Sequence, residues 1–350
     1  MTAPPVVARV RRGSFPESAH RGDAAVVDET GRPLGSCGDP SLPTFLRSAA
    51  KPFQALPLVE GGGMEEFRLT NADLALICAS HGGEPRHVRG AARLLARGGF
   101  SARDLVCGPH LPTHEPSARA LLARGERPTR LHNNCSGKHA GLLLACRVLG
   151  FSPRRYWQGD HPLQRAIRRR LSELTSHPES EMDEGIDGCG LVVYRVPLAA
   201  IALAYARLLS RAVAGETATQ GRARARVVEA MWAAPRMVAA AGFFTTEFLA
   251  AGSGRLIGKE GAEGVYAVGV RGRRGEKSAG LALKIEDGAA RARPAVTLAI
   301  LSEMGWLSAS ARRKLAAFAT APVVNAAGDT VGAIEPELPI IRRDAALSAG

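Results

Sequence analysis

Residues 264–285, GVYAVGVRGRRGEKSAGLALKI, have the pattern of two β-strands joined by a turn. The apolar runs Gly264–Val270 and Gly280–Ile285 are separated by a basic, glycine-rich stretch at 271–275. Apolar runs of this length, bounded by glycine, are typical of neighbouring strands. The sequence therefore predicts a strand-rich last third of the chain.

Both ends of the chain extend this pattern. The tetrapeptide ETGR at 29–32 is typical of a turn between strands, and so is Ala-Gly-Asp at 327–329. The runs of β-forming residues beside these turns, together with one at the N-terminus, are Val6–Val10, Ala24–Asp28, Val323–Asn325 and Thr330–Ile334.

The middle of the chain has a helical period instead. Proline is favoured at the first position of a helix, and Pro162 and Pro197 each precede an apolar stripe with three- and four-residue spacing. A third helix is predicted over 222–238. The two stripes are Leu163, Ile167, Leu171 and Leu174, and Leu198, Ile201, Tyr205 and Leu208.

These patterns predict an α+β fold with a central, mainly antiparallel sheet built from the N- and C-terminal segments. We expect the strands mainly in 1–45 and 255–340 and a helical region over roughly 48–250. No long linker divides the sequence, so residues 1–350 are predicted to form a single catalytic unit.

Composition favours a folded protein with an aliphatic core. Of 350 residues, 45% are hydrophobic and 23% charged, which argues against disorder. The N-terminus lacks the apolar segment of a secretory signal, and the longest apolar stretch, 191–209, is interrupted by Arg195, Pro197 and Arg207. We therefore expect a cytoplasmic protein without a membrane span, whose six cysteines are free thiols.

The net charge of +13 raises the question of nucleic-acid binding. The arginines are scattered, however, and no aromatic residues alternate with them to form a base-stacking surface, so a solvated basic surface without nucleic acid is favoured. Lysine is rare, with six residues against 40 arginines. Lysine can lose its proton in a protein and arginine cannot, so each lysine is a candidate for chemistry.

The segment RSAAKPFQ at 47–54 places Ser48 and Lys51 three residues apart. In a helix this spacing brings the hydroxyl and the amine to one face, where a neutral lysine can accept the serine proton. S-x-x-K is a short pattern that also occurs by chance. Two other segments have similar potential: CASHGGEPRH at 78–87, which contains Ser80 and His81, and KEGAEGVY at 259–266, which begins with Lys259.

The segment HNNCSGKHAG at 132–141 is dense in thiol, amine, imidazole and amide groups. An apolar run follows it, so we expect a loop entering a helix, with Ser136 as the cap and Gly150 as the stop. GIDGCG at 185–190 places Cys189 between two glycines, outside a regular helix.

Cys135 and Cys189 are possible thiolate ligands of zinc, although the usual spacing signals are absent. Two cysteines need a third ligand, and from the residues alone the choice stays open. The candidates are Lys138, His139, His132 and Asp187.

Together, these segments resemble the rhizobial-type, thermolabile L-asparaginase II family. The resemblance runs in collinear order from about Arg21 to about Glu335, and CSGKH with RSAAKPFQ is its most specific part. Further matching segments are CGPHLP (107–112), GDHPLQ (159–164), LALKIEDGAARA (281–292) and PVVNAAGDTVGAI (322–334).

The resemblance implies hydrolysis of L-asparagine to L-aspartate and ammonia, in a fold similar to serine β-lactamases and penicillin-binding proteins. It implies a homodimer with one zinc ion per chain. By this resemblance, the catalytic residues of the family correspond to the pairs Ser48–Lys51 and Ser80–Lys259. Its zinc ligands correspond to Cys135, Lys138 and Cys189, and candidates for orienting substrate or ligands are Arg47, His81, His139 and Asp187.

Two stretches depart from the family pattern. Leu191–Val193 stand where a Pro-Thr pair is usual, and 239–248 lack an expected arginine. These departures leave room for a related amidohydrolase that acts on glutamine or another amide. The sequence is also compatible with a basic nucleic-acid-binding protein and with a structural zinc protein that has no turnover.

Overall fold

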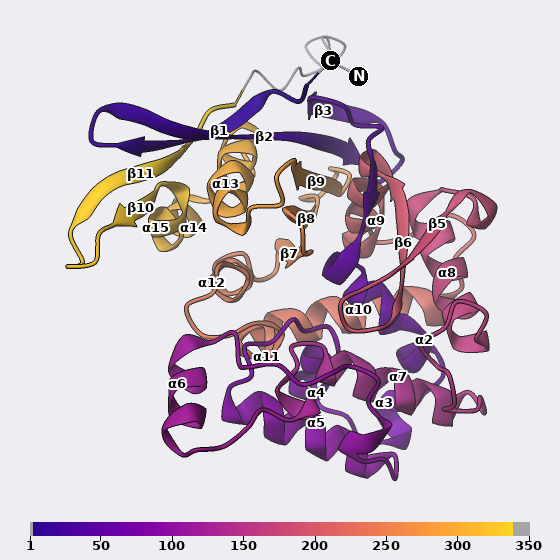
Figure 1. Cartoon of the computed structure of the whole chain (residues 1–350). Coiled ribbons are helices and arrows are strands. Elements are labelled where there is room, and N and C mark those ends of the chain that lie inside the picture. Colours follow the sequence, from indigo (N-terminus) through magenta and orange to yellow (C-terminus); the bar gives the residue numbers. More distant parts are fainter. Residues whose placement is uncertain (1–2, 339–350) are drawn as a thin grey trace. The chain divides into compact units, whose positions relative to one another are not determined.

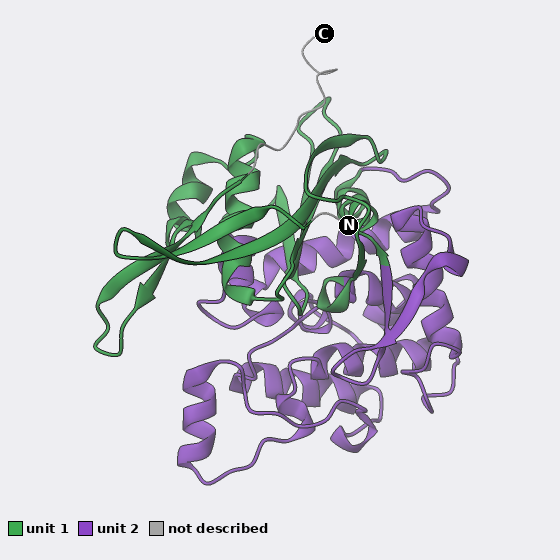
Figure 2. Cartoon of the chain, turned by 45° about the horizontal axis from the view of Figure 1, so that its top comes forward, with its two compact units in different colours: residues 1–49, 196–210, 251–350 green, residues 50–195, 211–250 purple. Residues whose placement is uncertain are grey.

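The computed structural model describes residues 3–338, and its contacts divide the chain into two compact units. Unit 1 comprises residues 1–49, 196–210 and 251–350, and unit 2 comprises 50–195 and 211–250 (Figure 2). Along the sequence, unit 2 is thus inserted into unit 1. The short segment 196–210 belongs to unit 1 and separates the two parts of unit 2. The prediction of a single catalytic unit concerns activity and stays a prediction.

Unit 1 is built on an eight-stranded sheet with the order β10-β11-β1-β2-β9-β8-β7, in which β3 also pairs with β2 (Figure 1). The described pairs are antiparallel. The predicted sheet from both chain ends is therefore confirmed. The strands are β1 (Val6–Arg12), β2 (Phe15–Asp28), β3 (Pro33–Cys37), β7 (Leu256–Glu260), β8 (Val265–Val270), β9 (Ala279–Ile285), β10 (Ala321–Val324) and β11 (Thr330–Pro336).

Helix α9 (Leu198–Leu209) packs on β2, β8 and β9 within unit 1. The approach is close enough to require glycine in the sheet, because a Cβ atom at Gly280 would lie 1.8 Å from the carbonyl oxygen of Ala202. Apolar residues on this helix, such as Ile201, are fully buried. The other elements of unit 1 are β4 (Pro43–Phe45), α13 (Arg293–Glu303), α14 (Ala309–Lys314) and α15 (Ala316–Ala319).

Unit 2 is mainly helical. Its helices are α1 (Lys51–Gln54), α2 (Leu56–Glu60), α3 (Gly63–Glu66), α4 (Asn71–Ile77), α5 (Pro85–Arg97), α6 (Glu115–Ala123), α7 (Ser136–Val148), α8 (Pro162–Thr175), α10 (Ala218–Ala233), α11 (Pro235–Val238) and α12 (Phe244–Ala251), the last of which ends at the unit boundary. Strands β5 (Asp183–Ile186) and β6 (Val192–Pro197) pair antiparallel.

Helices α4 and α7 lie against each other in the interior of unit 2. A Cβ at Gly137 would lie 2.3 Å from the carbonyl oxygen of Leu76, so only glycine allows this contact. Helix α4 begins with a capping box, in which Thr70 and Asp73 exchange side-chain and backbone hydrogen bonds. The two helices are thus fixed along their contact, and α4 is fixed at its N-terminus as well.

Most elements predicted from the sequence are present, with three differences. The helix predicted over 222–238 is two helices, α10 and α11, because Pro235 cannot continue the hydrogen-bond ladder of α10. Strands β5 and β6 were not predicted. The predicted cap of α7 is wrong by one residue: Cys135 is the N-cap, and Ser136 is the first helical residue.

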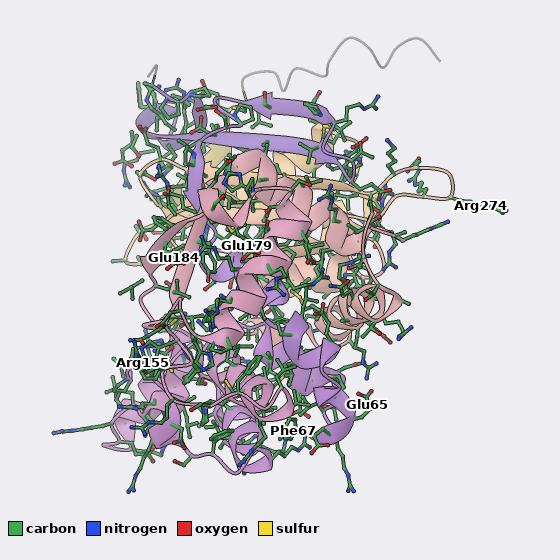
Figure 3. The ribbon with its side chains drawn as sticks, turned by 90° about the vertical axis from the view of Figure 1, so that its right-hand side faces the viewer. Glu65, Phe67, Arg155, Glu179, Glu184 and Arg274 are labelled. Carbon is green, nitrogen blue, oxygen red and sulfur yellow. The ribbon has the colours of Figure 1, made fainter. Side chains whose placement is uncertain are left out.

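The basic stretch 271–275 joins β8 to β9 as predicted, and Arg274 projects from this loop (Figure 3). The six cysteines are free thiols, and all six are buried. Among residues 3–338, no helix has both the length and the apolar character to cross a membrane. The cytoplasmic location stays a prediction.

Candidate active site

The loop between α4 and α5 carries Ser80 and His81, and hydrogen bonds to three distant segments hold its backbone. The amide of Ser80 donates to the carbonyl oxygen of Val238 at 3.0 Å, and that of His81 donates to Asn134 at 3.1 Å. The carbonyl oxygen of Gly82 accepts from the amide of His114 at 3.0 Å. The loop is therefore held in place by the rest of unit 2.

Lys51 reaches this loop from the first residue of α1. Its side chain is 1% exposed, and Nζ donates to the carbonyl oxygen of Ala79 at 2.6 Å and to Ser80 Oγ at 2.9 Å. Sequence reasoning placed Lys51 with Ser48 and did not foresee its contact with Ser80. The structure thus brings a buried amine and a serine hydroxyl into hydrogen-bond contact.

Ser48 lies in the 3₁₀ turn Arg47–Ala50, directly before α1 begins at Lys51. Its side chain is partly exposed, as a nucleophile must be to meet a substrate. The preceding residue, Arg47, has a φ of 49°, a left-handed conformation that is uncommon outside glycine and is often found at functional sites. The Ser48–Lys51 pair stays a prediction.

Lys259 lies in unit 1, in strand β7, and is fully buried. Its Nζ donates to Glu260 Oε1 at 2.6 Å. Gly261 and Gly264 lie in the turn from β7 to β8, and the strand predicted from Gly264 begins at Val265. The pairing of Lys259 with Ser80 stays a prediction.

Cys135, Lys138 and Cys189 lie together in unit 2. Lys138 Nζ donates to Cys189 Sγ at 2.9 Å, and the Cys135 and Cys189 thiols are hydrogen-bonded to each other. The three side chains are 2–5% exposed. Cys135 is the N-cap of α7, Lys138 lies one turn further, and Cys189 comes from the turn between β5 and β6.

The cluster has an asymmetric charge distribution. A hydrogen bond from Cys189 lowers the pKa of Cys135 well below its ordinary value, with help from the charges of Lys51 and Lys138 and against the effect of burial. The same hydrogen bond, together with burial, raises the pKa of Cys189. Burial acts to lower the pKa of Lys138, but the neighbouring Cys189 and Cys135 outweigh it and raise that pKa.

The donor set fits zinc in chemical type. Thiolate sulfur is a preferred zinc ligand, and a deprotonated amine nitrogen can be the third. Among the described residues there is no group of three or more His, Cys, Asp and Glu side chains that could hold a metal, and the zinc ion with Lys138 as its third ligand stays a prediction. Zinc would then replace the protons of Cys189 and Lys138.

His81 anchors the loop. Its Nδ1 accepts from the amide of Gly83 at 3.1 Å, and its Nε2 lies 2.9 Å from Ser136 Oγ, which donates its own proton to the carbonyl oxygen of Leu131. His81 Nε2 must therefore be the donor to Ser136. With both ring nitrogens in use, His81 has an anchoring role, and its predicted contact with substrate stays a prediction.

His139 is fully buried on α7, next to Lys138. Its Nδ1 lies 2.9 Å from Tyr156 Oη, a partner that the sequence analysis missed. Burial, together with the charges of Lys138 and Lys51, holds the pKa of His139 well below its ordinary value. The only sequence signal for Tyr156 is its place three residues before GDHPLQ, and nothing around it resembles a chemical motif.

Asp187 begins the turn that carries Cys189. Its amide donates to the carbonyl oxygen of Leu191 at 2.8 Å, and its Oδ1 accepts from the amide of Gly188 at 2.7 Å. The charge of Asp187 contributes to raising the pKa of Lys138. Asp187 therefore lies near the zinc-ligand candidates.

A family model described as L-asparaginase II matches residues 8–336. The chain belongs to the L-asparaginase II family. No curated protein matches its sequence. The predicted resemblance is thus confirmed over almost the whole described chain.

Among solved structures, the chain is similar to Mglu in its native form in the presence of 4.3M NaCl, with 17% identity and a TM-score of 0.37. The match covers 82% of this chain and 61% of Mglu, so the chain spans about three-fifths of that relative. A β-lactamase from Burkholderia vietnamiensis matches at 19% identity and a TM-score of 0.36, over 79% of this chain and 87% of its own. Both TM-scores lie below 0.5, so these similarities carry no argument about fold or chemistry.

The stretches that depart from the family pattern lie in unit 2. Leu191, Val192 and Val193 are buried at the start of β6, directly after the turn that carries Cys189. In the second stretch, Ala239 and Ala240 are buried before α12 begins. Both departures therefore change packed residues beside site segments and leave the cysteine and lysine candidates in place.

Proposed function

We propose that this protein hydrolyses the side-chain amide of L-asparagine to L-aspartate and ammonia. Membership of the L-asparaginase II family supports amide hydrolysis. The observation that carries the proposal is the position of the buried Lys51 amine, three residues after the candidate nucleophile Ser48 and in contact with the second candidate serine, Ser80, at 2.9 Å. Lysine and serine in contact form one of the known nucleophile-activating pairs.

The proposed reaction proceeds through an ester of Ser48. Ser48 Oγ attacks the side-chain amide carbon, and its proton passes to the neutral amine of Lys51. The C–N bond breaks, and the nitrogen leaves as ammonia after receiving a proton. Water then attacks the ester, which gives L-aspartate and restores the Ser48 hydroxyl. Ser80 and Lys259 assist proton transfer to the ammonia and from the water.

The α-amino acid part of the substrate needs groups of both charges. Arg47 suits the α-carboxylate, because a guanidinium binds a carboxylate with two parallel hydrogen bonds. Asp187 suits the α-ammonium group. His81 and His139 complete the proposed substrate-binding set.

Cys135, Lys138 and Cys189 would hold the proposed zinc ion. When bound, it would supply a fixed positive charge that orients an anionic part of the substrate. The three side chains prepare the site by converging from α7 and from the turn at 187–190. We also propose that the protein is a homodimer, which sedimentation analysis of the purified protein would test.

Ammonia release from L-asparagine, measured at neutral and alkaline pH with and without added zinc, tests the proposal. We expect release by the wild type and a loss of at least about 10³-fold in Ser48→Ala. Ser36→Ala, which removes a half-buried serine in β3, is the matched control and should keep wild-type activity.

The outcomes of this assay distinguish the candidate functions. If L-glutamine is hydrolysed as fast as L-asparagine or faster, L-asparagine is not the preferred substrate. Near wild-type activity of Ser48→Ala would exclude Ser48 as the nucleophile, and the same assay on Ser80→Ala would then test the serine that contacts Lys51. No release under any condition would refute the proposed reaction.

A further inference from the structure

One nitrogen of His139 is buried without a partner. His139 Nδ1 lies 2.9 Å from Tyr156 Oη, whereas Nε2 has no hydrogen-bond partner in the described chain. Both side chains are fully buried. An orphaned polar atom at such a depth costs free energy, and in native proteins it often marks a place that a ligand or water completes.

The hydrogen bonds around Tyr156 decide which ring nitrogen carries the proton. Tyr156 Oη accepts from the amide of Val106 at 3.2 Å. If the Tyr156 hydroxyl donates to His139 Nδ1, the buried Nε2–H is the one group without a partner. If His139 donates instead, the Tyr156 proton and Nε2 both lack partners. The first arrangement leaves fewer buried groups unsatisfied and is therefore favoured.

His139 and Tyr156 lie beside the candidate zinc ligands. His139 is adjacent to Lys138 on α7 and lies in the electrostatic fields of Lys138 and Lys51. The proposed function assigns His139 to substrate binding, and its unpartnered nitrogen is the atom of its ring that is left for such a contact.

We propose that Tyr156 is a positioning residue that holds His139 in the Nε2–H tautomer, so that Nε2–H donates a hydrogen bond to a carboxylate or amide oxygen of the substrate. The substrate part of this inference rests on the proposed asparaginase function. The tautomer part does not, because it follows from the contacts among His139, Tyr156 and Val106. Tyr156 acts through His139 and does not itself touch the substrate.

Nitrogen NMR of protein labelled with ¹⁵N-histidine tests the tautomer directly. The His139 signals are assigned by their loss in His139→Gln. In the wild type we expect His139 Nε2 to carry the proton and Nδ1 to be bare. In Tyr156→Phe, which keeps the ring and removes the hydroxyl, we expect a mixture of both tautomers.

Tyr194→Phe is the matched control. Tyr194 is another buried tyrosine of unit 2, and its hydroxyl donates to the backbone oxygen of Gln164 at 3.4 Å. We expect this variant to keep the wild-type His139 signals. A wild-type protein with the proton on Nδ1, or an unchanged tautomer in Tyr156→Phe, would overturn the proposal whatever the activity of the enzyme.

Steady-state kinetics test the substrate contact. We expect kcat/KM for L-asparagine to fall about 10- to 100-fold in Tyr156→Phe, as for other groups that orient a ligand-binding imidazole, and less than twofold in Tyr194→Phe. L-Aspartate added to the wild type should shift the His139 Nε2 signal. If the wild type hydrolyses no asparagine but the tautomers behave as expected, the proposed function fails and the role of Tyr156 stands. If it hydrolyses asparagine and Tyr156→Phe is unimpaired, the substrate contact fails.

Discussion

Lys51 in unit 2 and Lys259 in unit 1 are both buried, but their ammonium groups have different partners. Lys51 Nζ donates to a carbonyl oxygen and to the Ser80 hydroxyl and is also hydrogen-bonded to Cys135, whereas Lys259 Nζ donates to the Glu260 carboxylate. Each ammonium group thus meets an acceptor that can carry negative charge, and Lys51 meets a serine hydroxyl as well. Burial alone does not make a lysine a base, because the groups that face its nitrogen matter as much.

The largest expected effect tests this comparison directly. We expect Lys51→Met to lower kcat/KM for L-asparagine by at least about 10³-fold, because it removes the base, and Lys259→Met by about 10²-fold, as for an assisting proton-transfer group. The exposed Lys314→Met is the control. An equal or larger loss in Lys259→Met would show that the carboxylate neighbour does not weaken Lys259 as a proton-transfer group.

The next prediction compares a glycine of unit 2, next to Lys138 on α7, with a glycine of unit 1, in the turn after Lys259. A Cβ at Gly137 would lie 2.3 Å from the Leu76 carbonyl oxygen, and one at Gly261 would lie 2.7 Å from that of Leu46. We expect Gly137→Ala to reduce the free energy of unfolding by about 3 kcal/mol and Gly261→Ala by about 2 kcal/mol, as in other overpacked interiors. Urea denaturation measures both. Gly221→Ala, whose Cβ has more room, is the control, and a reversed order would contradict the packing argument.

Asp73 offers a smaller effect on α4, the helix that leads to Ser80. Burial raises the pKa of Asp73, but hydrogen bonds from Arg93 and Thr70 outweigh it and hold that pKa below its ordinary value. A carboxyl with a lowered pKa stabilises the fold above its unfolded pKa of about 3.9, and this contribution is lost as the pH falls through the folded pKa.

We therefore expect Asp73→Asn to lower the free energy of unfolding by about 2 kcal/mol at pH 7, from the lost cap and hydrogen bonds. The gap between variant and wild type should narrow as the pH falls below about 4. Denaturation curves across pH 3–7 measure it. A gap that stays constant with pH would show that the charge of Asp73 contributes nothing.

The smallest expected effect concerns the zinc ion that Cys135, Lys138 and Cys189 are proposed to hold. We expect dialysis of the zinc-loaded protein against a chelator to raise KM for L-asparagine about tenfold and to leave the far-ultraviolet circular dichroism unchanged. Cys189→Ser should bind zinc more weakly, by metal analysis. Unfolding of the wild type on chelation would support a structural zinc instead of one that positions substrate.

The sheet was more predictable than the site. Local patterns reveal a hairpin such as β8–β9, because its two strands and its turn are neighbours in sequence. The contact of Lys51 with Ser80 depends on a 29-residue separation and on the path of the loop after α4, which no local pattern contains. Sequence reasoning therefore identified both residues as candidates but assigned each a different partner.

Tyr156 shows the other limit of sequence reasoning. Its importance comes only from the hydroxyl that meets His139 Nδ1 and the amide of Val106, and residues at these three positions share no spacing rule. The segment that contains Cys135 and Lys138 was recognised because its reactive groups are adjacent in sequence. A site residue that acts through a single long-range contact has no such signature.

The backbone contacts of the loop at 78–84 also have a kinetic meaning. Its hydrogen bonds join Ser80 to Val238, His81 to Asn134, and Gly82 to His114, across very different sequence distances. Contacts between distant residues carry a loop-closure cost and form slowly. We therefore expect the Ser80 hydroxyl to meet Lys51 late in folding, after the segments that contain His114, Asn134 and Val238 have packed against this loop.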